Sequence, residues 1–269
     1  MRTFFLILLT CTMTATTTTN AQDTTIDWND QRQEIEGFGA SSAWFADNLY
    51  AFPEEEREKL LEIAFDKTNG LGISILRIKI EPRAFKEDTA AWDWDHKVVA
   101  AQIQLVGKAR ELGVNTVLAS PWTPSDWMKT NDSHKKGGSL KKEHYDTYAK
   151  ALSQFIERKK NKYDLTIDVL SLQNEGDEPK KWESCVWTVE EQSTFLSQHL
   201  APRLKADEVD VKIMANEHTM WDKHFKEWMI KMMNDPEVSE HLDIVAGHRY
   251  RGPRAKSFPE VKENNKSLW

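Results

Sequence analysis

Asp168-Val-Leu-Ser-Leu-Gln-Asn-Glu175 is a buried-strand pattern that ends abruptly on an amide and a carboxylate. Apolar runs of this kind are typical of parallel strands that are covered on both faces. In a parallel barrel, the last polar residues of each strand lie at the carboxyl-terminal face, where functional groups gather. The stretch therefore predicts an α/β fold in which Glu175 stands at a strand tip.

Short apolar runs alternate with longer amphipathic ones along the rest of the chain. The runs that predict strands are Ile35–Ala40, Ile73–Ile80, Thr116–Ser120, Asp168–Gln173, Val211–Ala215 and Asp243–Ala246. Apolar residues at helical spacing predict helices at Glu54–Phe65, Lys97–Leu112, Lys142–Arg158, Glu190–Leu204 and Lys223–Met233. Thr188 and Glu191 form a capping-box pattern ahead of the fourth helix. These repeats favour a closed (β/α)8 TIM barrel, since no glycine-rich phosphate loop follows any predicted strand.

The number of predicted strands falls short of a complete barrel. Six strands precede Lys266-Ser-Leu-Trp269, which has the pattern of a seventh. Since a barrel needs eight strands, we expect a barrel truncated after about six and a half β/α units. A partial sequence is the simplest explanation, with residues 22–269 as a partial barrel domain. A partner chain that completes the sheet is the alternative.

Residues 1–21 have the pattern of a signal peptide. Arg2 gives a positive start, Phe4–Leu9 an apolar core, and Thr19-Asn-Ala21 a small-residue cleavage site. The apolar run is too short to span a membrane as a helix. We therefore expect a secreted or periplasmic protein. A lipid anchor on Cys11 is the weaker alternative, because Thr10 is unfavourable immediately before a lipidated cysteine.

The composition is that of an ordinary globular protein, with 39% hydrophobic residues, 29% charged residues and a net charge of −7. An acidic chain gives no reason to expect a nucleic-acid partner. Without the signal peptide, Cys185 is the remaining cysteine, so we expect no intramolecular disulfide and a packed thiol. Because no Cys or His cluster has metal-ligand spacing, we expect no metal and no other cofactor. We predict no protein partner.

Polar and aromatic residues follow the predicted strands at the points where each strand ends. They are Arg77, Lys79, Glu81 and Arg83, Ser120-Pro-Trp-Thr-Pro124, Asn174-Glu175, Asn216-Glu-His218 and Gly247-His-Arg-Tyr250. In a barrel these groups converge on one face. The mixture suits a polyhydroxylated substrate, because aromatic rings stack on sugar faces while polar groups bond hydroxyls.

Three of these residues also have a structural interpretation. Arg77 can pair with a carboxylate inside the barrel, and Trp122 can pack in the core instead of facing a ligand. His248 can act as a hydrogen-bonded strut and not as a proton carrier. These alternatives stay open at the level of the sequence.

Several carboxylates compete for the role of catalytic acid. Glu81 and Glu217 also stand at strand tips, whereas Glu178 and Glu183 lie in the following loop and are expected to be solvated or structural. We favour Glu175, because the adjacent Asn174 is a natural partner for a sugar 2-hydroxyl whose bonding strengthens in the transition state.

Six segments, in order along the chain, carry a resemblance to a known family. They are Gln33-Glu-Ile-Glu-Gly-Phe-Gly-Ala40, Gly72-Ile-Ser-Ile-Leu-Arg-Ile78, Ser120-Pro-Trp-Thr-Pro124 with Trp127-Met-Lys129, Ser171-Leu-Gln-Asn-Glu175, Trp182-Glu-Ser-Cys-Val-Trp-Thr188 and Gly247-His-Arg-Tyr250. From about Trp28 to Trp269, the chain resembles glycoside hydrolase family 30, which includes xylanases and glucosylceramidases with a (β/α)8 barrel.

The resemblance implies a retaining glycosidase, whose two carboxyl groups lie about 5–5.5 Å apart. It implies that Glu175 is the general acid/base, with a pKa raised by burial and by the anionic nucleophile. It also implies that the substrate-binding residues are Asn174 at the 2-hydroxyl and, around the cleaved bond, Arg77, Trp122, His248 and Tyr250. The family's nucleophile ends a motif like Leu-Trp-Met-Thr-Glu, of which Leu268 and Trp269 match the first two residues. The nucleophile is therefore expected beyond Trp269.

Two further expectations follow from the resemblance. Thr25–Gln33 resembles the first strand of the family's β side-domain, so a remnant of that domain is expected at the N-terminus. Gly176 stands where the family usually has proline, which is expected to loosen the loop that carries Glu175.

The segments around Trp122 and Cys185 most resemble the family members that cleave plant-type polysaccharides. The sequence therefore predicts an endo-β-1,4-xylanase that binds a polysaccharide or oligosaccharide. A β-1,6-glucanase, a β-1,6-galactanase or a glucosylceramidase-like enzyme is the alternative. Without a nucleophile, residues 1–269 alone are expected to be inactive, and at most to bind carbohydrate.

Overall fold

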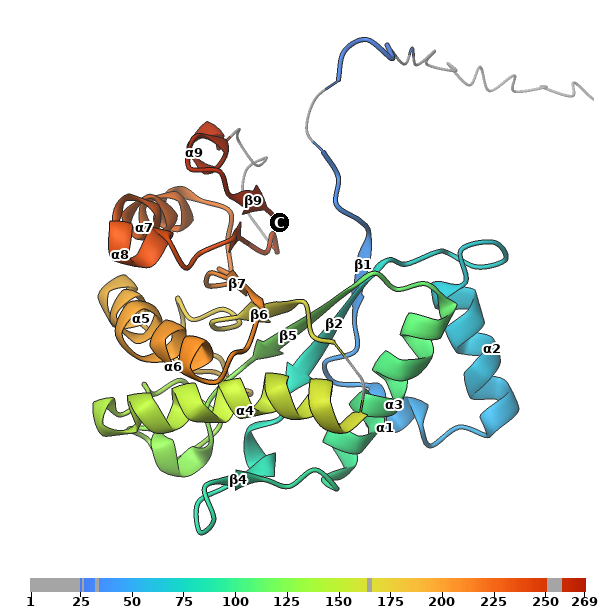
Figure 1. Cartoon of the computed structure of the whole chain (residues 1–269), viewed down its shortest axis with the longest axis horizontal. Coiled ribbons are helices and arrows are strands. Elements are labelled where there is room, and N and C mark those ends of the chain that lie inside the picture. The colour runs from blue at the N-terminus through green and yellow to red at the C-terminus, as the bar shows by residue number, and fades with distance from the viewer. Residues whose placement is uncertain (1–24, 26, 32–33, 164–165, 251–257) are drawn as a thin grey trace, which may run out of the picture. The chain divides into compact units, whose positions relative to one another are not determined.

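The computed structural model describes residues 25, 27–31, 34–163, 166–250 and 258–269 (Figure 1). The chain divides into two units, Met1–Glu36 and Gly37–Trp269. The predicted signal peptide, residues 1–21, lies outside the described residues. In the segment expected to hold a side-domain strand, the described residues contain a turn at Trp28 and Asn29 and no strand. The expected strand is therefore wrong for these residues, since a lone strand leaves its backbone groups unpaired.

Seven parallel strands form one sheet in the unit Gly37–Trp269. In sheet order they are β1 (Gly39–Ser41), β2 (Ile75–Ile80), β5 (Thr116–Pro121), β6 (Val169–Ser171), β7 (Lys212–Met214), β8 (Ile244–Val245) and β9 (Ser267–Leu268). Their order follows the chain without reversal, as in a barrel, whereas a doubly wound sheet reverses at a switch point. The predicted TIM-barrel fold is confirmed, and the seventh strand lies where the sequence places it.

The helices between these strands lie along one face of the curved sheet (Figure 1). The long ones are α2 (Glu54–Phe65), α3 (Lys97–Leu112), α4 (Tyr145–Tyr163) and α7 (Lys223–Asn234), and all four were predicted. Shorter helices are α1 (Ala46–Leu49), α8 (Pro236–Ser239) and α9 (Pro259–Glu263). Within the described part of the chain, none of the helices combines the length and apolar character that a membrane span requires.

The predicted helix Glu190–Leu204 is divided into three parts. They are α5 (Val189–Thr194), a π-helical turn (Phe195–Leu200) and α6 (Ala201–Ala206). Pro202 explains the wider turn, because proline has no N–H to donate and its ring crowds the carbonyl four residues earlier. The predicted capping box is present: Glu191 N donates to Thr188 Oγ1 at 3.1 Å, and Thr188 N donates to Glu191 Oε2 at 2.9 Å.

Two local features differ from the sequence prediction. Strand β1 begins at Gly39 instead of Ile35. A hairpin of β3 (Phe85–Lys86) and β4 (Ala91–Trp92) follows β2, and its strands are too short to give a periodic signal.

Side chains alternate between the two faces of the sheet. Leu76, Val117 and Leu170 belong to the large apolar core that includes the helices. The opposite face carries a separate, smaller cluster of Leu118, Val169, Met214, Ile244 and Ala246, packed against Trp269. The second cluster corresponds to the interior layer of a barrel, which side chains from neighbouring strands fill. This apolar layer closes the inside of the sheet below the polar residues at the strand ends.

Candidate active site

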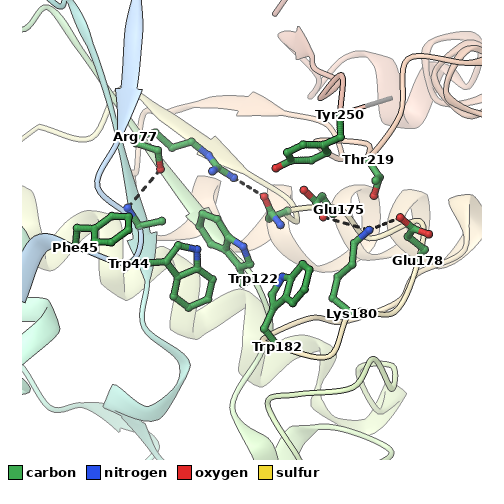
Figure 2. A pocket seen from close by; sticks show the side chains of 13 residues that line it. Trp44, Phe45, Arg77, Trp122, Glu175, Glu178, Lys180, Trp182, Thr219 and Tyr250 are labelled. Carbon is green, nitrogen blue, oxygen red and sulfur yellow. Dashed lines mark hydrogen bonds and ion pairs between the residues drawn. The ribbon is translucent and has the colours of Figure 1, made fainter. Parts of the chain in front are cut away.

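A pocket of about 500 Å³ lies at the carboxyl-terminal ends of the strands (Figure 2). Its lining residues are Ser41, Ala43, Trp44, Phe45, Arg77, Trp122, Asn174, Glu175, Glu178, Lys180, Trp182, Thr219 and Tyr250. The lining thus comes from β1 and β2 and from the segments that follow β1, β5, β6, β7 and β8. Of the predicted site residues, Arg77, Trp122, Asn174, Glu175 and Tyr250 line the pocket. His248 is not in the lining but contacts the Glu175 carboxylate.

The backbone of Glu175 is held in an unusual conformation. Its φ is +49°, in the left-handed region that residues with a side chain rarely adopt. Glu175 N donates to Glu217 O at 2.9 Å, and Asn174 N donates to Pro121 O at 2.8 Å, so neighbouring strand ends fix the tip from both sides. Strain of this kind persists where the surroundings over-determine the conformation, and it is concentrated at functional sites.

The Glu175 carboxylate contacts cations and a phenol. His248 Nδ1 is 2.9 Å from Oε1, Lys180 Nζ is 3.4 Å from Oε2, and the Tyr250 hydroxyl is also hydrogen-bonded to the carboxylate. Burial acts to raise the pKa of Glu175, but the His248 and Tyr250 hydrogen bonds and the charges of His248 and Lys180 lower it overall. In the described residues the pKa of Glu175 is thus lowered, whereas the raised pKa expected for the whole protein stays a prediction. That expectation assumed an anionic neighbour, and the contacts here are cationic.

Arg77 combines the two roles that the sequence left open. Its guanidinium pairs with Glu217 Oε2 at 2.8 Å, as the structural interpretation requires. It also donates to Asn174 Oδ1 at 2.6 Å and to Ser120 Oγ at 3.0 Å while it lines the pocket. Because Arg77 bonds Oδ1, the amide nitrogen of Asn174 is left to donate to a ligand.

Trp122 both packs and lines the pocket. It is only 4% exposed, because the Arg77 guanidinium covers its ring at 4.2 Å and Trp44 meets it edge-on at 5.5 Å. Wider apolar faces are offered to the pocket by Trp44, Trp182 and Tyr250, which are 42%, 52% and 66% exposed.

His248 joins two carboxylates. Its Nδ1 contacts Glu175 and its Nε2 is 3.4 Å from Glu217 Oε2. Burial acts to lower the pKa of His248, but its bonds to Glu175 and Glu217 raise the pKa to about 9. For Glu217, burial acts to raise the pKa, while Arg77 and His248 hold it at about 2. His248 is therefore a cationic strut, and Glu217 is a buried structural anion outside the pocket lining.

We expect the free energy of unfolding of the whole protein to depend on His248 at alkaline pH. Its folded-state pKa of about 9 exceeds the ordinary value of 6.5, so its contribution is complete below pH 6.5 and is lost as the pH rises through 9. The contribution is up to about 3 kcal/mol. Urea denaturation of the wild type and His248→Gln on either side of this interval provides the measurement. A stability difference that stays constant with pH would contradict the prediction.

Glu81, at a strand tip, and Glu183, in the loop after Glu175, form a buried cluster away from the pocket lining. Lys79 Nζ lies 2.8 Å from Glu81 Oε2 and 3.0 Å from both oxygens of Glu183, and Arg83 Nε lies 2.6 Å from Glu81 Oε1. Burial acts to raise the pKa of Glu81, but the Arg83 and Lys79 contacts lower it to about 2. Glu81 and Glu183 are thus structural anions, whereas Glu178 is partly exposed and lines the pocket.

Gly176 is tightly packed, contrary to the expectation that it loosens the loop. Its N–H donates to Asn216 Oδ1 at 2.9 Å, a bond that proline could not make. A Cβ at this position would lie 2.9 Å from both Asn216 Oδ1 and Gln173 Cγ. The close approach explains why a glycine fits immediately after Glu175.

Several lining residues were missed by the sequence analysis. Trp44 and Phe45 follow β1, whose tip could have been read like the tips of the other strands. Lys180 and Trp182 lie in the loop after Glu175, and only the path of that loop brings them into the pocket. Cys185, in the same loop, is fully buried, and burial raises the pKa of its thiol to about 12, which fits a packed residue. Among the residues that the structure describes, no group of His, Cys, Asp and Glu side chains has a metal-binding arrangement.

Comparisons with known proteins identify relatives along most of the chain. It is 28% identical to glucuronoxylanase XynC of Bacillus subtilis over 259 residues, which are 93% of this chain and 53% of the relative. It is 27% identical to putative glucosylceramidase 3 of Caenorhabditis elegans over 248 residues, 84% of this chain and 47% of the relative. The chain spans about half the length of these curated relatives.

Solved structures agree with these relatives. The glycoside hydrolase family 30 subfamily 8 xylanase Xyn30A of Clostridium acetobutylicum has a TM-score of 0.73 and 29% identity, covering 88% of this chain and 55% of that one. The endo-beta1,6-glucanase BT3312 has a TM-score of 0.77 at 24% identity, with 88% and 57% covered, and shows the shared fold. The model of the glycosyl hydrolase family 30 TIM-barrel domain matches residues 35–267. The chain therefore belongs to glycosyl hydrolase family 30.

Proposed function

We propose that the whole protein is a retaining β-glycoside hydrolase in which Glu175 is the general acid/base. The observation that carries the proposal is the position of Glu175 in the pocket, beside Asn174 and in contact with His248, Lys180 and Tyr250. Membership of the glycosidase family supports the same reaction class and a carbohydrate substrate. The proposal assigns no cofactor, no metal and no nucleic-acid partner.

In this mechanism, Glu175 protonates the glycosidic oxygen while a second carboxylate attacks the anomeric carbon. The bond to the leaving sugar breaks, and the second carboxylate becomes joined to the anomeric carbon in a glycosyl-enzyme ester. In the second step, Glu175 takes a proton from an incoming water, whose oxygen attacks the anomeric carbon and breaks the ester, so that the sugar is released with retained configuration. We propose Asn174 as the donor to the 2-hydroxyl, oriented by Arg77. Trp122, with Trp44 against it, and Tyr250 would form the apolar wall beside the reacting sugar.

We propose that the nucleophile follows Trp269 by about three residues, as the family motif implies. Gly247 N donates to Trp269 O at 3.1 Å, so the segment after Trp269 leaves the sheet next to the residue that precedes His248. Reading the DNA downstream of the Trp269 codon tests this point. A frame that continues Met-Thr-Glu supports the proposal, and a stop codon would leave carbohydrate binding without hydrolysis as the remaining function.

For the substrate, we propose a plant-type polysaccharide cleaved as by an endo-β-1,4-xylanase. Similarity to glucuronoxylanase XynC and xylanase Xyn30A supports this choice. The second candidate is a glucosylceramidase-like activity, because putative glucosylceramidase 3 is 27% identical, nearly as similar as XynC. A β-1,6-glycan-cleaving activity is the remaining alternative.

A reducing-sugar assay of the whole protein on xylan, glucuronoxylan, β-1,6-glucan and β-1,6-galactan tests the substrate. We expect sugar release from xylan or glucuronoxylan and little from the other polymers. Activity restricted to a glucosyl lipid would overturn the choice, and binding without hydrolysis on every substrate would overturn the proposed reaction.

We further propose that residues 1–21 are a signal peptide that exports the protein, and that residues 22–269 belong to the barrel domain. The support is the charge and apolar pattern of the first residues. N-terminal sequencing of the protein from the culture medium or periplasm checks it, with cleavage expected after Ala21.

A further inference from the structure

The loop after Glu175 returns one lysine to the pocket in a fixed position. Lys180 N donates to Ser184 Oγ at 3.1 Å, and Ser184 Oγ also lies 3.1 Å from Lys180 O. The Lys180 side chain is only 13% exposed and lines the pocket. Ser184 thus holds the backbone of Lys180, and ion pairs with Glu175 and Glu178 hold its ammonium at the pocket.

That ammonium is shared between two carboxylates. Lys180 Nζ is 3.4 Å from Glu175 Oε2 and forms an ion pair with Glu178 Oε1 (Figure 2). Glu175 is 6% exposed, whereas the Glu178 side chain is 45% exposed. The buried carboxylate and the partly exposed one therefore compete for the same positive charge.

The other groups that face Glu175 follow different strands from the Lys180 loop. His248 and Tyr250, which follow β8, contact the carboxylate directly. Glu217, after β7, is bound to His248, and Arg77, on β2, is bound to Glu217. Glu217 is 4% exposed and His248 is 22% exposed, whereas Tyr250 is 66% exposed. Because none of these ion pairs involves Lys180 or Glu178 except through Glu175 itself, substitutions at Lys180 and Glu178 leave the His248–Glu217–Arg77 pairs in place.

We propose that Lys180 is a positioning residue for Glu175, and that Glu178 controls how much of the Lys180 charge the acid/base experiences. This inference rests on the proposed role of Glu175. When Glu175 gives its proton to the leaving oxygen, its carboxyl group becomes an anion, which a cation within about 4 Å stabilises. When the carboxylate then takes a proton from water, the same cation opposes that step. The pair thus sets the pH range in which Glu175 can perform both.

Opposite shifts of the pH–rate profile are the expected signature. The alkaline limb of kcat/KM reports loss of the proton from the acid. Lys180→Met removes the cation, so that Glu175 keeps its proton longer and the limb moves to higher pH by about one unit. Glu178→Gln leaves the whole charge of Lys180 to Glu175, and the limb moves to lower pH by a smaller amount.

Two controls separate this effect from altered folding. Lys180→Arg keeps the charge, so its alkaline limb should stay near that of the wild type. Lys181→Met removes an exposed neighbouring charge and should not move the limb. The inference would be overturned if the alkaline limb moved in the same direction in Lys180→Met and Glu178→Gln. It would also be overturned if the wild type were active and the limb moved in neither variant.

A second measurement keeps the inference separate from the proposed reaction. If the wild type hydrolyses none of the substrates, the proposed function fails. NMR titration of the carbon-13-labelled Glu175 carboxyl in the wild type and Lys180→Met then still decides the role of Lys180. A higher pKa of Glu175 in Lys180→Met supports it, and an unchanged pKa overturns it.

Discussion

Replacement of Glu175 with Gln in the whole protein is expected to lower kcat/KM on an unactivated polysaccharide by about 10²–10⁴-fold. The amide fills the same space but cannot give a proton to the leaving oxygen. The left-handed backbone of Glu175 and its bond to Glu217 O do not depend on the side chain, so the fold should be retained. Initial rates of reducing-sugar release provide the measurement.

Comparison of two substrates identifies the cause of the loss. An aryl glycoside with a good leaving group needs little protonation, so Glu175→Gln should form the glycosyl-enzyme from it with a much smaller loss than from the polysaccharide. Glu227→Gln changes a side chain that is 61% exposed and serves as the matched control. Wild-type turnover of polysaccharide by Glu175→Gln would contradict the assignment. Equal losses on both substrates would point to damaged binding instead of lost proton transfer.

Replacement of Lys79 with Met is expected to destabilise the whole protein by about 3–5 kcal/mol, the effect of breaking a buried ion pair from one side. Lys79 is 3% exposed, and its loss leaves Glu81 with Arg83 but takes the ammonium away from Glu183. Urea denaturation followed by tryptophan fluorescence gives the change in the free energy of unfolding.

Two variants show that burial causes this effect. Lys79→Met combined with Glu183→Met removes both charges, so it should recover part of the stability that Lys79→Met alone loses. Lys223→Met breaks an ion pair with Glu227 whose side chains are 88% and 61% exposed, and should cost less than about 1 kcal/mol. Similar losses in Lys79→Met and Lys223→Met would show that burial does not decide the strength of these pairs.

Hydrophobic periodicity was sufficient to predict the fold. Helices α2 and α3 begin and end where their apolar spacing predicts, and β9 lies at Ser267–Leu268 within the predicted seventh strand. Each of these elements buries one face, so the spacing of apolar residues along the segment itself predicts it. The interruption at Phe195–Leu200 was not predicted, since it arises from Pro202 acting on the turn before it.

The candidate site was predictable only where its residues stand at strand ends. Asn174 and Glu175 lie there, and parallel strands necessarily deliver their tips to one edge. Lys180 and Trp182 reach the pocket only because the loop after Glu175 folds back, and a periodic pattern does not predict the path of a loop. The contacts of Glu175 with His248 and Lys180, which lower its pKa in the described residues, were not predictable for the same reason.

Charges alternate in sign along an unbroken series of ion pairs through the pocket: Arg77, Glu217, His248, Glu175, Lys180 and Glu178. With His248 protonated, the series holds as many cations as anions, so its field cancels within a short distance. These six residues therefore add little long-range attraction for a charged molecule, unlike clefts lined by one sign of charge. If the substrate is the neutral polysaccharide that we propose, these six residues would offer it strong local polarity without drawing competing ions from solution.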